Sequence, residues 1–161
     1  MSLRFSMFLA VLFSMSAVAG APALAAVPAG APQLPPQPKT RPVGMPADAL
    51  LISPCVAQMG EHWANPKNLP FGPIYGTYEG KPVFTEIMID KKAFAAGTTY
   101  TDQLKPLPGY AINHVDIQYV PYGHAGYPIP HYDIHAYYVS HAMHDTFCPT
   151  GAREFTKPQS H

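Results

Sequence analysis

Charged side chains are scarce in this sequence. Only 12% of the 161 residues are Asp, Glu, Lys or Arg, about half the usual share in globular proteins, and the formal net charge is zero. The sequence has no run of Lys or Arg, so neither a nucleic acid nor an anionic lipid surface is expected as a partner. Because a weakly charged surface protects poorly against association, we expect a homo-oligomer.

A long hydrophobic run is also missing. The most apolar segment, Met7–Val18, follows Arg4 and precedes the small-x-small pattern Ala23-Leu24-Ala25. This arrangement is typical of a cleaved signal peptide, which we place at residues 1–25. The apolar segment is too short to favour a membrane span, although an uncleaved N-terminal anchor is the alternative. We therefore expect a periplasmic or secreted protein with no stable membrane insertion after signal cleavage.

The remaining chain predicts one domain. Residues 26–47 are dense in Pro and Ala and predict a disordered linker. Residues 48–154 form a single predicted β-rich domain, and residues 155–161 a polar tail.

The sequence has only two cysteines, Cys55 and Cys148. In an exported protein such a pair is most simply a disulfide. A thiolate metal or redox pair is the alternative, but the C-x-x-C spacing typical of such pairs is absent.

Histidine, in contrast, is concentrated. Six of the eight histidines lie between His114 and His144. Gly and Pro residues at 121–130 divide this segment into two runs rich in Val, Ile and Tyr, which predict two strands joined by a turn. Alternate residues of a strand point to the same face. If the strands pair, two polar faces meet: His114, Asp116 and Gln118 on the first, and His131, Asp133, His135 and Tyr137 on the second.

Other segments also predict strands. Residues 74–78 and 82–89 form a predicted hairpin around Glu79-Gly80. The segment from Cys55 to Pro66 is expected to be a loop or a single helical turn, because Gly60 and Pro66 interrupt it. Short helices are expected at residues 90–97 and 140–147. The predicted fold class is mainly β, a small barrel or sandwich, with one or two short helices.

The clustered His and Asp side chains predict a metal site, because imidazole and carboxylate are usual ligands of Zn²⁺, Cu²⁺ and Fe²⁺. Strand residues four apart lie about 13 Å apart, so His131 and His135 are not expected to share one ion. The ion is expected to take ligands from both strands. The candidate ligands are His114, Asp116, His124, His131, Asp133 and His135, with His62 and Glu86 as candidate additional ligands.

Alternatives stay open for each of these residues. The central cluster can instead be a structural network of hydrogen-bonded His, Asp and Tyr. His62 can pack beside Trp63, and Glu86 can face outward. His141, Met143 and His144 form either a cluster suited to copper or a solvated helix end.

Three stretches carry a resemblance to known proteins. They are Cys55-x-x-x-Met59-Gly60-x-His62-Trp63-x-x-Pro66, then Pro73-Ile74-Tyr75-Gly76, and then His114-x-Asp116 through Gly123-His124 to Pro130-His131-Tyr132-Asp133-x-His135. Together they resemble an uncharacterised family of exported bacterial proteins, a domain of unknown function first described around a thermophile protein controlled by an extracytoplasmic-function sigma factor. The resemblance covers roughly residues 50–145. It implies a mostly β, self-associating domain of the cell envelope or exterior, and no established activity.

Three functions remain. The first is a periplasmic or secreted β domain that binds a divalent metal or a small ligand through the His/Asp cluster. The second is a cupin-like metal-dependent enzyme, a hydrolase or oxygenase, with Glu86 or Asp133 as general base. The H-x-H strand motif of cupins is absent, and catalytic residues stay unassigned. The third is a non-catalytic oligomeric envelope protein in which a His/Asp/Tyr network specifies packing.

Overall fold

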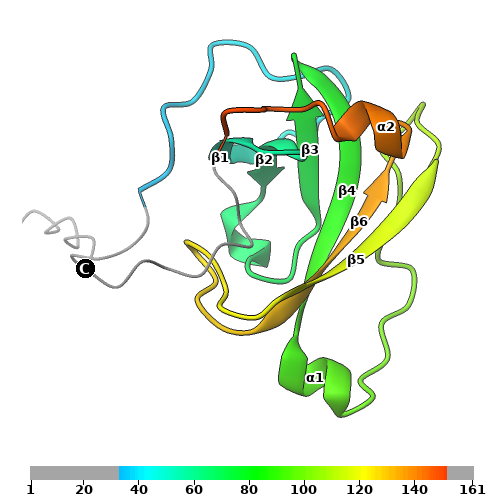
Figure 1. Ribbon diagram of the computed structural model, residues 1–161. Coiled ribbons are helices and arrows are strands. Elements are labelled where there is room, and N and C mark those ends of the chain that lie inside the picture. Colours follow the sequence, from blue (N-terminus) through cyan, green and yellow to red (C-terminus); the bar gives the residue numbers. More distant parts are fainter. Residues whose placement is uncertain (1–32, 152–161) are drawn as a thin grey trace, which may run out of the picture. The chain divides into compact units, whose positions relative to one another are not determined.

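The computed structural model describes residues 33–151, which form one six-stranded antiparallel sheet (Figure 1). The strand order is β1-β2-β3-β4-β6-β5. The strands are β1 (Leu50–Val56), β2 (Gly60–Ala64), β3 (Ile74–Tyr78), β4 (Lys81–Asp90), β5 (His114–Val120) and β6 (His131–Tyr137). The helices are α1 (Lys91–Ala95), α2 (His141–His144) and a 3-10 turn, Pro66–Asn68. The predicted signal peptide and polar tail lie outside the described residues.

The mainly β fold class with two short helices is confirmed. Within residues 33–151, β1 and β5 are the edge strands and do not pair with each other, so the sheet is open and is not a closed barrel. The helices lie at opposite ends of the sheet, α1 directly after β4 and α2 after β6 (Figure 1). No helix in the described part of the chain is long and apolar enough to cross a membrane.

The expectation of a loop or helical turn from Cys55 to Pro66 is wrong, because this segment ends β1 and forms all of β2. Gly60 has a φ of +100°, and a Cβ there would lie 2.3 Å from the Thr77 carbonyl oxygen. Strand β2 therefore begins with glycine, because the side chain of any larger residue would collide with the backbone of β3 at this position. As a result His62 lies on β2, opposite Gly76 of β3.

The other predicted elements are present. β3 and β4 form the predicted hairpin, and the Asp90 side chain caps α1 by accepting the backbone N–H of Lys92 at 2.6 Å. In the β5–β6 pair, Asp116 lies opposite His135 and Gln118 lies opposite Asp133. The two predicted polar faces therefore meet on one side of the sheet.

Strand β4 joins the two halves of the sheet, because it pairs with β3 on one side and β6 on the other. Ile87 and Ile89 pack with Ile134 of β6 on one face. Glu86 alternates with them and so lies on the opposite face, opposite His135 in the strand register.

The predicted disulfide between Cys55 and Cys148 is present, with Cα atoms 5.8 Å apart. It ties the segment after α2 to β1. The Phe147 carbonyl also accepts the backbone N–H of Gln58 at 2.8 Å, and the Phe147 ring stacks on Tyr78. Helix α2 is thus held beside the turn between β1 and β2.

Part of the predicted linker contacts the sheet. The Gln37 side chain donates to the Leu51 carbonyl at 2.9 Å and accepts the Leu51 N–H at 2.8 Å, so it pairs with edge strand β1 as a backbone would. Met45 is buried in a cluster with Trp63 and Leu107. The folded unit therefore includes residues that the sequence assigns to the linker at 26–47.

Candidate metal centre

Imidazole and carboxylate side chains gather beside one face of the sheet in three groups, and the donor atoms of each group lie within 4.8 Å of one another. We name the groups the inner triad (His62, Glu86, His135), the rim cluster (His114, Asp116, His141, His144) and the loop group (His124, His131, Asp133). The six ligands predicted for one central site are thus divided among all three groups.

The inner triad draws one side chain from each of β2, β4 and β6. Glu86 Oε2 lies 3.9 Å from His62 Nε2, and Glu86 Oε1 lies 3.6 Å from His135 Nε2. The Phe84 ring packs edge-on against both imidazoles. His62, Glu86 and His135 are 5%, 2% and 0% exposed, so the outward-facing alternative for Glu86 is wrong.

Burial keeps both imidazoles of the triad neutral. Loss of solvent lowers the pKa of His62 to about 4, with a smaller contribution from His124. The same cause lowers the pKa of His135 to about 3, against the opposing effect of Asp133. At neutral pH each ring therefore has a lone pair available for a metal without first losing a proton.

Hydrogen bonds orient His62 toward Glu86. Its Nδ1 lies 3.0 Å from Ser53 Oγ, whose hydroxyl donates to the Pro54 carbonyl, so Nδ1–H is the donor and Nε2 keeps the lone pair. No hydrogen bond orients His135 in this way, because neither of its ring nitrogens has a hydrogen-bond partner among the described residues. A buried polar atom left in this state costs about 1–3 kcal/mol. His135 therefore needs a further partner beside Glu86.

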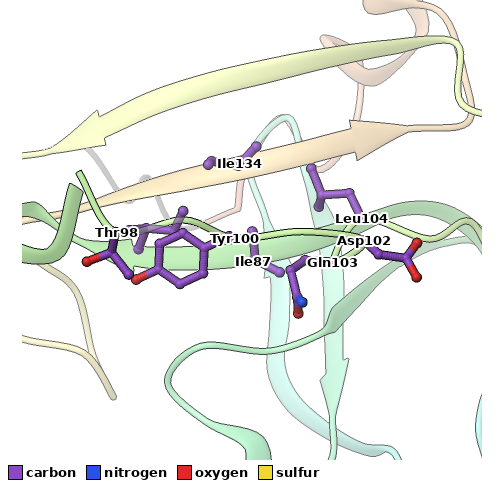
Figure 2. A pocket seen from close by; sticks show the side chains of 8 residues that line it. Ile87, Thr98, Tyr100, Asp102, Gln103, Leu104 and Ile134 are labelled. Carbon is purple, nitrogen blue, oxygen red and sulfur yellow. The ribbon is translucent and has the colours of Figure 1, made fainter.

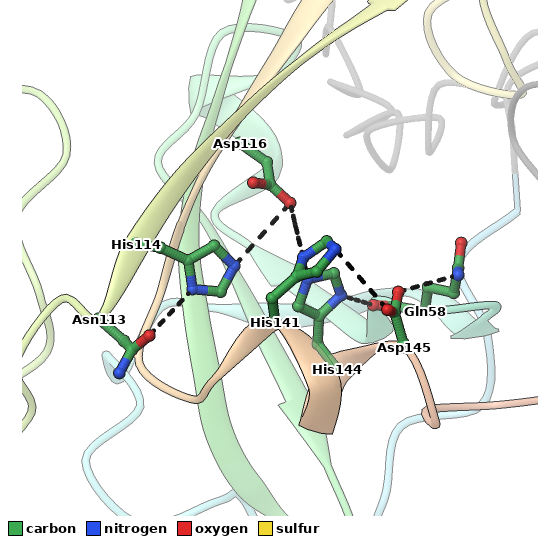
Figure 3. Close-up of polar contacts among 7 residues, drawn as sticks. All are labelled: Gln58, Asn113, His114, Asp116, His141, His144 and Asp145. Atoms are coloured by element: carbon green, nitrogen blue, oxygen red, sulfur yellow. Dashed lines mark hydrogen bonds and ion pairs between the residues drawn. The ribbon is translucent and has the colours of Figure 1, made fainter.

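The rim cluster lies where α2 meets β5 (Figure 3). Asp116 Oδ2 is its centre, 3.9 Å from His114 Nε2, 3.8 Å from His141 Nδ1 and 3.6 Å from His144 Nε2. His144 is buried, which lowers its pKa, whereas the His141 side chain is 65% exposed. The cluster therefore opens to solvent on the His141 side.

The loop group consists of short-range contacts. The His131 Nδ1–H donates to the Ile129 carbonyl at 2.6 Å, and His131 Nε2 lies 3.0 Å from Asp133 Oδ1. The His124 ring meets the His131 ring edge-on, with ring centres 4.8 Å apart. A structural His–Asp pair accounts for these contacts as well as a metal site does.

Tyr137 separates the inner triad from the rim cluster. Its ring stacks on His144 with ring centres 4.1 Å apart, on His114 at 5.0 Å and on His135 at 5.5 Å. An aromatic ring between two sets of ligands makes them two distinct sites rather than one.

The predicted set of main ligands does not include His141 and His144. They join Asp116 because the disulfide-linked segment folds α2 back onto β5, a contact that no local pattern specifies. The available signal was their spacing of three residues in a predicted helix, which puts them on one face. From the sequence alone they are instead expected to form a cluster with Met143, whose side chain is largely exposed.

Fold and site together define a small β domain with a disulfide and with His/carboxylate groups that can hold a metal ion. No family model and no curated protein matches the chain. Among solved structures, it is similar to the hypothetical protein TTHB210 from Thermus thermophilus, with a TM-score of 0.50 and 23% identity, covering 60% of this chain and 87% of that one. At this identity the likeness concerns the fold alone.

Proposed function

We propose that this protein is an exported β domain that holds one divalent transition-metal ion in the inner triad. The observation that carries the proposal is His135, a fully buried neutral imidazole with no hydrogen-bond partner on either nitrogen among the described residues. A cation between His62, Glu86 and His135 supplies that partner.

The donor set selects the class of metal. Two imidazoles and one carboxylate favour Zn²⁺, Cu²⁺ or Fe²⁺, whereas Mg²⁺ and Ca²⁺ prefer oxygen ligands. A tetrahedral ion about 2.0–2.1 Å from each donor brings two donors to about 3.3 Å from each other. The separations in the triad are 3.6 Å from Glu86 Oε1 and 3.9 Å from Glu86 Oε2, and its donor atoms lie within 4.8 Å of one another, so the side chains must move inward to complete the coordination.

Binding explains the triad better than cupin-like catalysis. A cavity of about 470 Å³ lies between Ile87 and Ile134 of the sheet and the loop at residues 98–104 (Figure 2). This is the face of the sheet opposite Glu86 and His135. A second cavity of about 450 Å³ lies beside α1. Neither cavity is lined by a residue of the three groups, so a substrate bound in either is remote from the triad.

Export to the periplasm or the exterior is part of the proposal. It is supported by the signal peptide predicted at residues 1–25 and by the disulfide, which persists in oxidising compartments. The three motifs quoted above support membership of the exported family that they resemble.

Self-association is a further part of the proposal. Val115, Ile117 and Tyr119 of edge strand β5 point away from the polar face and are 48%, 61% and 40% exposed. A row of apolar side chains on an edge strand favours pairing with a second copy. Light scattering of the purified domain tests this part, and a monomer at micromolar concentration contradicts it.

The metal is tested by elemental analysis of protein exported to a periplasm and purified without affinity-tag histidines. After dialysis against a chelator, one equivalent of a single metal is expected to remain. His62→Gln and His135→Gln are expected to lose it, while the exposed His141→Asn keeps it and serves as the matched control. If no metal binds even after incubation with Zn²⁺ and Cu²⁺, the triad is a structural network, and the two substitutions change stability alone.

A further inference from the structure

We infer that the rim cluster is a second metal site, which exchanges a divalent transition-metal ion with solvent. Among these ions it binds Cu²⁺ most tightly. Its residues, His114, Asp116, His141 and His144, are different from those of the inner triad. The inference therefore stands or fails independently of the function proposed above.

The distances around Asp116 are those of ligands near a common centre. Three imidazole nitrogens lie 3.6–3.9 Å from the same oxygen, Asp116 Oδ2 (Figure 3). These separations are too long for hydrogen bonds, which span about 2.7–3.2 Å. They are about half an ångström longer than the 3.3 Å between two ligands of one tetrahedral ion. An ion at the centre therefore needs only a small contraction of the cluster.

Hydrogen bonds hold the imidazoles of His144 and His114 with the ligating nitrogen inward. The His144 Nδ1–H donates to the Gln58 carbonyl at 3.1 Å, and the His114 Nδ1–H donates to Asn113 Oδ1 at 3.2 Å. Each ring therefore presents the Nε2 lone pair to Asp116. An oxygen acceptor on the far nitrogen is the arrangement that commonly orients a metal-bound histidine.

His114 shows that the arrangement is incomplete without a further partner. Its Nε2 is buried and has no hydrogen-bond partner among residues 33–151, although a carboxylate oxygen lies 3.9 Å away. A nitrogen lone pair and a carboxylate oxygen repel each other unless a proton or a metal cation lies between them. His114 Nε2 and the Asp116 carboxylate therefore both have electron pairs available for a metal ion.

His141 is the entry point of the site. It lies on α2, 65% exposed, and its Nδ1 lies 2.7 Å from His144 Nε2, so in the absence of a metal the His141 Nδ1–H donates to the His144 lone pair. That hydrogen bond must open by roughly half an ångström before both nitrogens bind one ion. Because His141 faces solvent, an ion can enter and leave here without unfolding of the sheet, unlike an ion in the inner triad.

The donor set favours copper. Imidazole and carboxylate are donors that Cu²⁺ accepts, and Cu²⁺ binds most tightly among the first-row divalent ions. Met143 does not contribute to this set, because its side chain is 53% exposed and no contact places it at Asp116.

Cu²⁺ titration of the oxidised mature protein, followed by electron paramagnetic resonance, tests the inference. One Cu²⁺ with nitrogen hyperfine structure is expected, and a chelator should remove it within minutes. His141→Asn and Asp116→Asn are each expected to weaken its binding at least about 10-fold, the size of effect known for residues that support metal ligands. Met143→Ala, next to His141 on α2, is the matched control and should bind Cu²⁺ as the wild type does.

Two results overturn the inference. One is unchanged Cu²⁺ affinity in His141→Asn, an exposed substitution that leaves the fold intact. The other is a spectrum without imidazole nitrogen. His62→Gln separates the two sites, because it removes the chelator-resistant ion of the inner triad and should leave the exchangeable Cu²⁺ in place.

Discussion

Glu86 and His135 are direct partners in the β4–β6 register, and Glu86 Oε1 lies 3.6 Å from His135 Nε2 in a region closed to solvent. A buried carboxylate is costly unless a positive charge or strong donors compensate for it. Burial of His135 lowers the pKa of its imidazole to about 3, so His135 does not supply the charge at neutral pH. A metal ion bound in the inner triad lies beside both side chains, and the stability of the protein should then depend on that ion.

Glu86→Gln should abolish the dependence of stability on metal. The substitution keeps the side-chain shape and removes the carboxylate charge. It also removes a ligand, so the stabilisation that excess Zn²⁺ gives to the wild type, about 3–4 kcal/mol at 100–1,000 times the Kd, should disappear. Urea unfolding with Zn²⁺ and with chelator measures this dependence. Glu79→Gln, in the exposed β3–β4 turn, is the control, and equal Zn²⁺ stabilisation of wild type and Glu86→Gln contradicts the assignment.

Acid should destabilise the metal-free protein before its carboxylates titrate. The folded-state pKa values of His62 and His135, about 4 and about 3, lie below the value of 6.5 in the unfolded chain. The unfolded state therefore binds more protons below pH 6.5, and the free energy of unfolding falls as pH falls. By pH 5 the loss is on the order of 2 kcal/mol for each histidine.

Urea unfolding at intervals from pH 7 to pH 5 measures this dependence in the presence of a chelator. His62→Gln should reduce the loss between pH 7 and pH 5 by on the order of 2 kcal/mol, the share that His62 contributes. Met143→Ala changes an exposed side chain that does not titrate, and it is the control that should leave the slope unchanged. A free energy of unfolding that stays constant over this range would show that the triad histidines are not buried in neutral form.

Gly76 should be sensitive to substitution by alanine. A Cβ at this position would lie 2.1 Å from the Phe84 ring, which packs against both His62 and His135. Gly76→Ala therefore displaces Phe84 and is expected to cost about 1–3 kcal/mol of stability. It should also lower metal retention in the inner triad, and elemental analysis of the folded variant checks this. Full retention of the metal would mean that Phe84 does not position the triad.

The polar face was predictable from the sequence because strands alternate with a period of two. That period places His114 with Asp116 and places Asp133 with His135, and the β5–β6 register confirms that these pairs meet. The division into separate groups also follows from strand geometry, since residues four apart, such as His131 and His135, cannot approach one ion.

The contributions from outside this hairpin were harder to predict. His62 reaches Glu86 because Gly60 adopts a positive φ against β3, a long-range contact that makes a strand out of an apparent loop. His141 and His144 reach Asp116 because the Cys55–Cys148 disulfide and the burial of Phe147 fix α2. Sequence patterns report local periodicity, whereas these placements depend on tertiary packing.

Metal binding at the rim cluster should depend on the disulfide more strongly than metal binding at the inner triad does. Cys55–Cys148 closes 93 residues of chain, and its loss is expected to lower stability by about 4–5 kcal/mol. In the folded protein its loss also loosens α2, which carries His141 and His144, whereas His62, Glu86 and His135 stay on paired strands. The Cys55→Ser/Cys148→Ser variant should therefore bind Cu²⁺ at the rim several-fold more weakly and still retain the chelator-resistant ion. Cu²⁺ titration and elemental analysis of this variant, at a temperature where circular dichroism shows it folded, separate the two effects. Equal weakening at both sites would mean that the disulfide acts on global stability alone, and unchanged rim affinity would mean that Phe147 packing suffices to position α2.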